Sequence, residues 1–249
     1  MSRFLALVRH PVFLCVISFC FCFCLGLILF FPLGIYTRQL EELAQRQGLE
    51  LRISSPELLF PAGFGADNLQ LGSPRIPHPP LSFSDLDVYP LWTTLLGDNP
   101  GVQFRSRVLQ GELSGTAFRN GEVKLELSGM EISESLAPQL PVTLSGSIDQ
   151  GEFDGTLPFQ GSNSSTMRLE MSGLQLVGLQ QFGGSEDILP LGRLSASIQA
   201  TGPLLKISSL DISGSALQLH GSGTLRLSPT PEHSSISLTL SLIPQESLD

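Results

Sequence analysis

Side chains that could carry out catalysis or bind a metal are few and widely spaced along the chain. Beyond the N-terminal apolar run the histidines are His78, His220 and His233. None has a His, Cys or Glu partner at the spacing of a metal site. His78 lies in a Pro-rich stretch, His220 on the polar face of an expected strand and His233 in a polar turn, so each is predicted to be a solvated surface side chain.

Two further motifs could bind ions. Asp85 and Asp87 are two residues apart, so on a strand they share a face and could hold a cation. They lack the glycine and additional oxygen ligands of a calcium loop, and a solvated strand face is the preferred interpretation. Gly221-Ser-Gly223 begins like a phosphate-binding motif, but strand sequence follows instead of a helix, which predicts a turn or bulge. No catalytic, metal-binding or cofactor-binding residue is predicted, and the chain is interpreted as non-enzymatic.

All four cysteines lie within one apolar run near the N-terminus, at positions 15, 20, 22 and 24. Phenylalanines at positions 19, 21 and 23 alternate with them, which favours small apolar filler in a membrane helix over a metal site. No cysteine follows, so the rest of the chain is expected to fold without disulfides, as a domain of this size can.

The charge balance excludes nucleic acid as a partner. The formal net charge is -9, and Lys124 and Lys206 are the only lysines. Phosphate binding needs clustered basic side chains that release counterions, and this chain has no such cluster. The same acidic balance disfavours electrostatic attachment to anionic lipid.

The apolar run predicts a membrane anchor. Val12 to Phe31 is almost wholly apolar, and 20 helical residues span the roughly 30 Å of a bilayer core. A cleaved signal peptide would have a shorter run and a small-x-small cleavage site, which Pro32 to Thr37 does not offer. Arg3 and Arg9 precede the run, so the N-terminus is expected in the cytoplasm. The predicted organisation is a cytoplasmic tail (1–10), a transmembrane helix (11–33), a juxtamembrane helix (34–48) ending at Gly48, and a periplasmic β domain (49–249).

From Glu50 onward, the hydrophobic pattern changes to the period of a β-strand. Val123, Leu125 and Leu127 alternate with polar residues, and similar alternation recurs towards the C-terminus. This pattern is typical of antiparallel strands with one buried face. The predicted fold is mainly β, an antiparallel amphipathic sheet with one or two short helices. Pro90 to Gly97 is the main candidate for such a helix, and Leu174 to Gly184 could hold another turn.

Internal similarity indicates that the sheet is built from a repeated unit. The segment from Val123 to Ile132 matches that from Met167 to Leu176, and Gly111 to Gly115 matches Gly151 to Gly155. A looser third copy begins at Leu210. Such repeats suggest a sheet extended by successive hairpins. The sequence leaves open whether the apolar face closes as a sandwich or barrel or curls into a groove.

The architecture and the motifs Leu-x-Leu-Ser-Gly and Gly-x-Leu-x-Gly resemble the type II secretion system protein GspN family. The C-terminal run from Leu210 through Leu227, followed by Ser235 to Leu240, is similar too. More distantly the chain resembles AsmA-like envelope proteins, whose amphipathic sheets form lipid-accommodating grooves. The resemblance implies a bacterial inner-membrane protein that is an accessory component of type II secretion, with other secretion subunits as partners. The alternative it implies is a groove that binds or transfers phospholipid.

Overall fold

The computed structural model describes residues 33–46, 48–72, 80–132, 143–157, 163–178, 188–214, 217–228 and 234–244, with a few positions between 15 and 26. The predicted cytoplasmic tail, most of the predicted transmembrane helix, the Pro-rich segment, His78 and His233 lie outside these residues. Within the described residues, no helix is long and apolar enough to cross a membrane.

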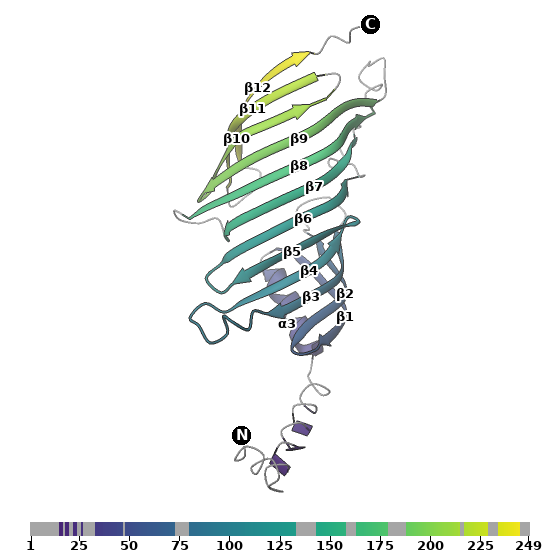
Figure 1. Cartoon of the computed structure of the whole chain (residues 1–249), viewed down its shortest axis with the longest axis vertical. Coiled ribbons are helices and arrows are strands. Elements are labelled where there is room, and N and C mark those ends of the chain that lie inside the picture. The colour runs from purple at the N-terminus through teal and green to yellow at the C-terminus, as the bar shows by residue number, and fades with distance from the viewer. Residues whose placement is uncertain are drawn as a thin grey trace, which may run out of the picture.

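One antiparallel sheet of twelve strands makes up the fold, and its spatial order follows the chain order from β1 to β12 (Figure 1). Every strand therefore pairs with its sequence neighbours, as expected for a sheet built from hairpins. The strands are β1 (Glu50–Leu59), β2 (Gly63–Gly72), β3 (Leu81–Pro90), β4 (Gly101–Val108), β5 (Gly111–Phe118), β6 (Glu122–Ile132), β7 (Thr143–Thr156), β8 (Ser164–Val177), β9 (Ile188–Thr201), β10 (Leu204–Ser213), β11 (Leu217–Arg226) and β12 (Ser235–Pro244).

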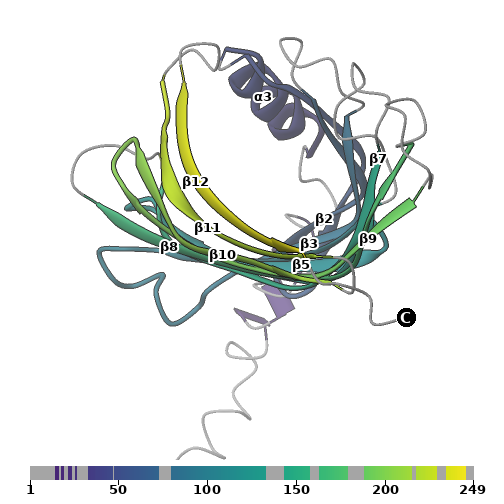
Figure 2. The same ribbon diagram turned by 90° about the horizontal axis from the view of Figure 1, so that it is seen from above.

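The sheet is strongly curved into a trough. Figure 2 looks along the trough and shows the strands bending into a U, with helix α3 (Leu33–Arg46) at its mouth beside β1. The mainly β, antiparallel fold predicted from the alternation is confirmed. Of the arrangements that the sequence left open, the described residues adopt the curved groove, since no second sheet packs on the first.

Helix α3 ends where the sequence predicts. Gly48 has a left-handed φ of 78°, and its N–H donates to the Gln45 carbonyl at 2.9 Å. The Leu49 N–H donates to the Ala44 carbonyl at 3.0 Å, which completes a glycine C-cap. The helix is tied to the sheet by Glu41, whose Oε1 accepts a hydrogen bond of 3.1 Å from the Ile53 N–H on β1.

The predicted helix from Pro90 to Gly97 is wrong. Residues 92–96 form successive turns in the connection between β3 and β4. The Leu91 N–H bonds to the Gly101 carbonyl at 2.9 Å, which closes the two strands on each other. Between them, the Thr94 and Gly97 N–H groups bond to carbonyls three residues back, which makes turns and not an α-helix. In the other candidate stretch, Leu174 to Val177 continues β8, and the residues from 179 to 184 are not described.

The internal repeat corresponds to strand pairs. The two matching segments lie in β6 and β8, and the two glycine motifs lie in β5 and β7. The equivalent residues Gly129 and Gly173 share a left-handed backbone, with φ of 64° and 62°. Each repeat is therefore one hairpin, and its Ser-Gly step requires glycine because that backbone strains other residues.

Candidate functional site

The strand register aligns apolar residues into a continuous row across the whole sheet. Following the partners from β1 to β12, every position is apolar or glycine. We call this the central apolar row: Leu58, Phe64, Val88, Phe104, Gly115, Leu125, Phe153, Met167, Ile198, Ile207, Gly223 and Leu238. Strands lie roughly 4.8 Å apart, so eleven intervals extend about 50 Å.

Parallel apolar rows flank the central one. On one side, Leu113, Leu127, Leu169 and Leu210 share a row with Gly151, Ala196 and Leu240. On the other side, Val102, Ala117 and Val123 continue through Gly155, and the row resumes with Ala200, Leu205, Leu225 and Ile236. One face of the sheet is therefore apolar apart from a few small polar side chains, such as the buried Ser106 and Ser165 in these flanking rows.

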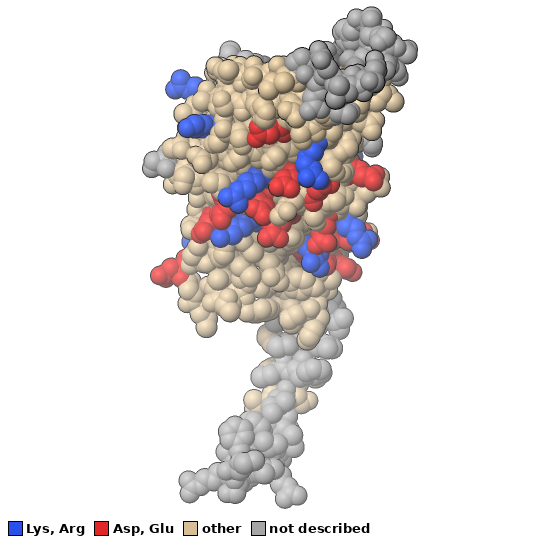
Figure 3. Space-filling model, turned by 45° about the horizontal axis from the view of Figure 1, so that its top comes forward, with Lys and Arg blue, Asp and Glu red and all other residues tan. Residues whose placement is uncertain are grey.

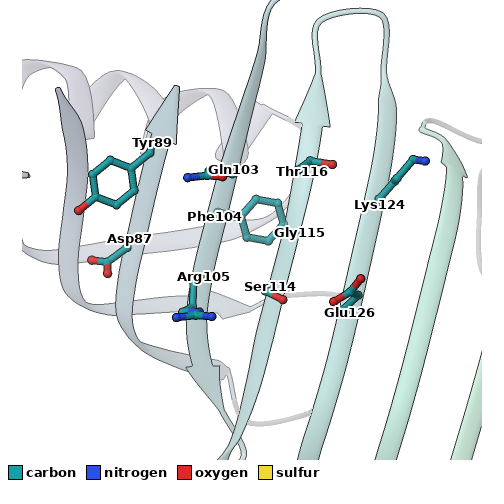
Figure 4. Close-up of a pocket in the computed structure, with 10 residues that line it drawn as sticks. All are labelled: Asp87, Tyr89, Gln103, Phe104, Arg105, Ser114, Gly115, Thr116, Lys124 and Glu126. Carbon is teal, nitrogen blue, oxygen red and sulfur yellow. The ribbon is translucent and has the colours of Figure 1, made fainter. Parts of the chain in front are cut away.

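The apolar face is the concave one. Figure 4 views the opposite face, where Gln103, Arg105, Thr116 and Lys124 point towards the viewer and α3 lies behind the sheet. Since α3 lies at the mouth of the trough in Figure 2, the polar face is the outside and the apolar rows line the inside.

Glycines on the concave face let the trough curve. At Gly115 an added Cβ would lie 3.0 Å from the Phe104 ring and 3.0 Å from Leu125 Cδ2. At Gly221 it would lie 2.7 Å from Leu240 Cδ2. Because bending brings the side chains of neighbouring strands together on the inner face, the missing side chains relieve the crowding. Gly221 and Gly223 lie within β11 and not at a turn, and the register shift nearby falls on β10.

The described part of the chain covers the lining of the trough only partly. Seven apolar side chains are buried among the described residues: Ala66, Val108, Met130, Met171, Leu174, Ala196 and Ala200. The large lining residues Phe104, Leu125, Met167 and Ile198 are half-buried. On β12 the inward side chains are more open still, with Ile236 65% and Leu242 59% exposed. Among the described elements only α3 lies over the mouth, and it contacts β1.

The convex face carries charged side chains that pair across strands. Arg105 bonds to Glu112 at 2.6 Å, Lys124 to Asp154 at 3.2 Å, and His220 Nδ1 lies 2.7 Å from Asp211 Oδ1. These side chains are largely exposed, and Figure 3 shows acidic and basic residues mixed over the convex surface. Exposed pairs of this kind contribute about 0–1 kcal/mol each. They keep the outer face soluble and do not form a catalytic cluster.

The convex face also has a shallow hollow of about 550 Å³ (Figure 4). It lies between Asp87 and Tyr89 of β3, Arg105 of β4, and Lys124 and Glu126 of β6. Its basic side chains already pair with Glu112 and Asp154. The hollow is therefore a depression between solvated side chains.

The structure does not bring the candidate ion-binding side chains Asp85, Asp87 and His220 together into one site. Asp85 has a left-handed φ of 51° at a register shift and bonds to Arg107 at 3.0 Å, whereas Asp87 lies opposite Arg105. Each aspartate thus lies near an arginine. His220 is on the polar face, as predicted, and is 56% exposed. Among the described residues no group of three His, Cys, Asp or Glu side chains could hold a metal.

Comparison of the chain with protein-family models, with curated proteins and with solved structures finds no match. The trough itself is therefore the feature that indicates function. The alternation in the sequence indicated an apolar face. Its continuity from β1 to β12 depends on the strand register, which no single strand reveals.

Proposed function

We propose that the protein is a non-enzymatic, inner-membrane-anchored envelope protein whose β trough binds the acyl chains of lipids. The observation that carries the proposal is the central apolar row, which crosses all twelve strands on the concave face. An apolar surface of this size left in water is costly, at roughly 25 cal/mol per Å². An acyl chain would cover it without needing directional polar contacts.

The dimensions suit a lipid. Half of a bilayer's hydrocarbon core is about 15 Å thick, so a trough of about 50 Å is longer than one extended lipid tail. The open mouth would leave the polar headgroup in water. The predicted anchor, followed directly by α3 and β1, would place the first strands beside the membrane from which lipid could enter.

The proposal is tested by counting phospholipids that co-purify with the full chain in detergent. The double variant Ile198→Asp/Leu225→Asp places two charges on the concave face of β9 and β11, where both side chains are half-buried. The control Gln199→Asp/Thr224→Asp places the same charges on the neighbouring, exposed, convex positions of the same strands. We expect the concave variant to lose bound phospholipid while the control retains the wild-type amount. Equal retention by both variants, each folded by circular dichroism, would refute a lipid-binding trough.

A second candidate function is the accessory role in type II secretion implied by the motif resemblance, with other secretion subunits as partners. The structural feature that favours it is the outer edge of β12, which pairs with no other strand among the described residues and whose ten residues carry no charge. At the other edge, β1 carries Glu50, Arg52 and Glu57, contains Pro56, and is contacted by α3. Edge strands without such protection readily pair with a strand of another protein.

The secretion role predicts that subunits of the secretion machinery co-purify with the full chain through β12. A charge on the edge strand, Thr239→Lys, should abolish this association. Thr224→Lys is the matched control, because Thr224 is an equally exposed threonine on the same convex face of the interior strand β11. If the wild-type chain enriches no secretion subunit, the second candidate fails and the trough proposal is unaffected.

A further inference from the structure

The loop between β3 and β4 exposes a compact group of large apolar side chains. Trp92 is 55% exposed, Leu95 44% and Leu96 101%. We call these three residues the apolar tip. Figure 1 shows the loop projecting from the sheet near the end where α3 and β1 lie. The loop from 91 to 100 contains no basic residue and one acidic residue, Asp98.

Hydrogen bonds within the loop hold the apolar tip in its exposed position. The Thr94 hydroxyl donates to the Leu91 carbonyl at 2.8 Å and accepts from the Gly101 N–H at 3.0 Å. The Gly97 N–H donates to the Thr94 carbonyl at 3.0 Å. Thr94 thus fastens the loop from within and leaves its apolar side chains directed outwards.

A second contact fixes the loop to the adjacent hairpin. The Asn120 N–H donates to Asn99 Oδ1 at 3.0 Å, which joins the β3–β4 loop to the β5–β6 turn. A loop held at both ends and at its side presents its apolar tip as a fixed protrusion. A fixed apolar protrusion can insert into a lipid bilayer, which deforms around it. A protein partner would instead need a pocket of matching shape.

Two of the connections near β1 expose large apolar side chains. In an antiparallel meander, the β1–β2, β3–β4 and β5–β6 connections all lie on the same side of the sheet, along one line of strand ends. Phe60 in the first is 87% exposed, and the apolar tip belongs to the second. The third is Arg119-Asn120-Gly121, which is polar. Phe60 and the apolar tip therefore lie in the two odd-to-even connections nearest to α3 and the predicted anchor.

We propose that the apolar tip inserts into the interfacial region of the bilayer in which the protein is anchored, and so sets the orientation of the trough relative to the membrane. Tryptophan favours this region because its ring is apolar and its N–H can bond to headgroups or water. The absence of basic residues means that insertion depends on apolar contact and not on anionic lipid. This contact is with the bilayer surface and is separate from lipid binding in the trough.

Trp92 is the only tryptophan in the chain, so its fluorescence reports on the apolar tip alone. The full chain is reconstituted into phosphatidylcholine vesicles, with and without phosphatidylglycerol, in which part of the lipid carries bromine on its acyl chains. We expect a blue-shifted emission, strong quenching by bromolipid and weak quenching by acrylamide in water. The result should not depend on phosphatidylglycerol.

Two variants make the test specific. Trp92→Phe/Thr239→Trp moves the probe to the exposed convex side of β12, about 50 Å from β1, where we expect several-fold less bromine quenching and strong acrylamide quenching. Leu96→Asp should reduce the bromine quenching of Trp92. Emission at the wavelength of water-exposed tryptophan, or a blue shift without bromine quenching, would overturn the proposal. The second of these outcomes would indicate burial against protein.

Discussion

At the scale of single residues, the curvature of the trough depends on glycines on its concave face. An added Cβ at Gly115 would meet the Lys124 carbonyl oxygen as well as Phe104 and Leu125. We therefore expect Gly115→Ala to destabilise the protein by about 1–3 kcal/mol, the usual cost of overpacking. Thermal unfolding of the full chain in detergent, followed by circular dichroism, measures this.

Gly72→Ala is the control for Gly115→Ala. Its added Cβ would lie 3.4 Å from the Pro80 Cβ, an ordinary contact, and the change should shift stability by no more than about 0.5 kcal/mol. If both alanine variants unfold at the wild-type temperature, crowding of the concave face is not what selects glycine at position 115.

Residue types in the sequence predicted which side chains share a face better than they predicted local backbone geometry. The alternation around Val123 assigned the two faces of β6 correctly. It could not indicate that Asp85 lies at a register shift, because that shift depends on pairing with β4. The apolar tip was also missed. Its spacing resembles that of a short helix, and the closure of β3 onto β4 decides otherwise.

At the scale of elements, helix α3 and strand β12 give the sheet two different ends. Glu41 of α3 is half-buried and accepts the Ile53 N–H, an amide of the β1 edge. We expect Glu41→Ala to accelerate hydrogen exchange of the Ile53 amide, since removing the acceptor leaves that N–H open to water. Exchange in the central strands should be unchanged. Glu42→Ala, at the exposed neighbouring position, is the control, and acceleration by both variants would show that α3 detaches as a whole.

The strands were predictable as elements, but the way they assemble was not. Alternation identifies a half-buried strand whether the sheet closes or stays open. The outcome depends on where glycines and register shifts fall in neighbouring strands, such as Gly115 beside Phe104 and the shift between Ile207 and Leu210. The equivalent Gly129 and Gly173 show that one hairpin geometry recurs. Recurrence of one curved unit explains why the sheet extends as a trough.

At the scale of the whole molecule, the two faces of the sheet separate two environments. Ion pairs and hydroxyl groups cover the convex face, and apolar rows run along the concave face from β1 to β12. This arrangement gives an apolar path that leads away from the end of the chain where the anchor is predicted. The apolar tip, proposed to orient the trough on the membrane, lies near the β1 end of that path. The proposed protein partner would bind at the β12 end.

Photo-crosslinking in cells that make the full chain can show whether the concave face holds phospholipid. A photoreactive amino acid replaces Leu125, Ile198 or Leu238 in the central apolar row, and in matched chains it replaces Glu126, Gln199 or Thr239 on the convex face of the same strands. The account predicts phospholipid adducts, identified by mass spectrometry, at the three concave positions and not at their convex neighbours. Position 238 is the decisive one, because it lies about 50 Å along the sheet from β1, the strand that follows α3 and the predicted anchor. Absence of adducts at the concave positions, or equal yields on both faces, would contradict the account.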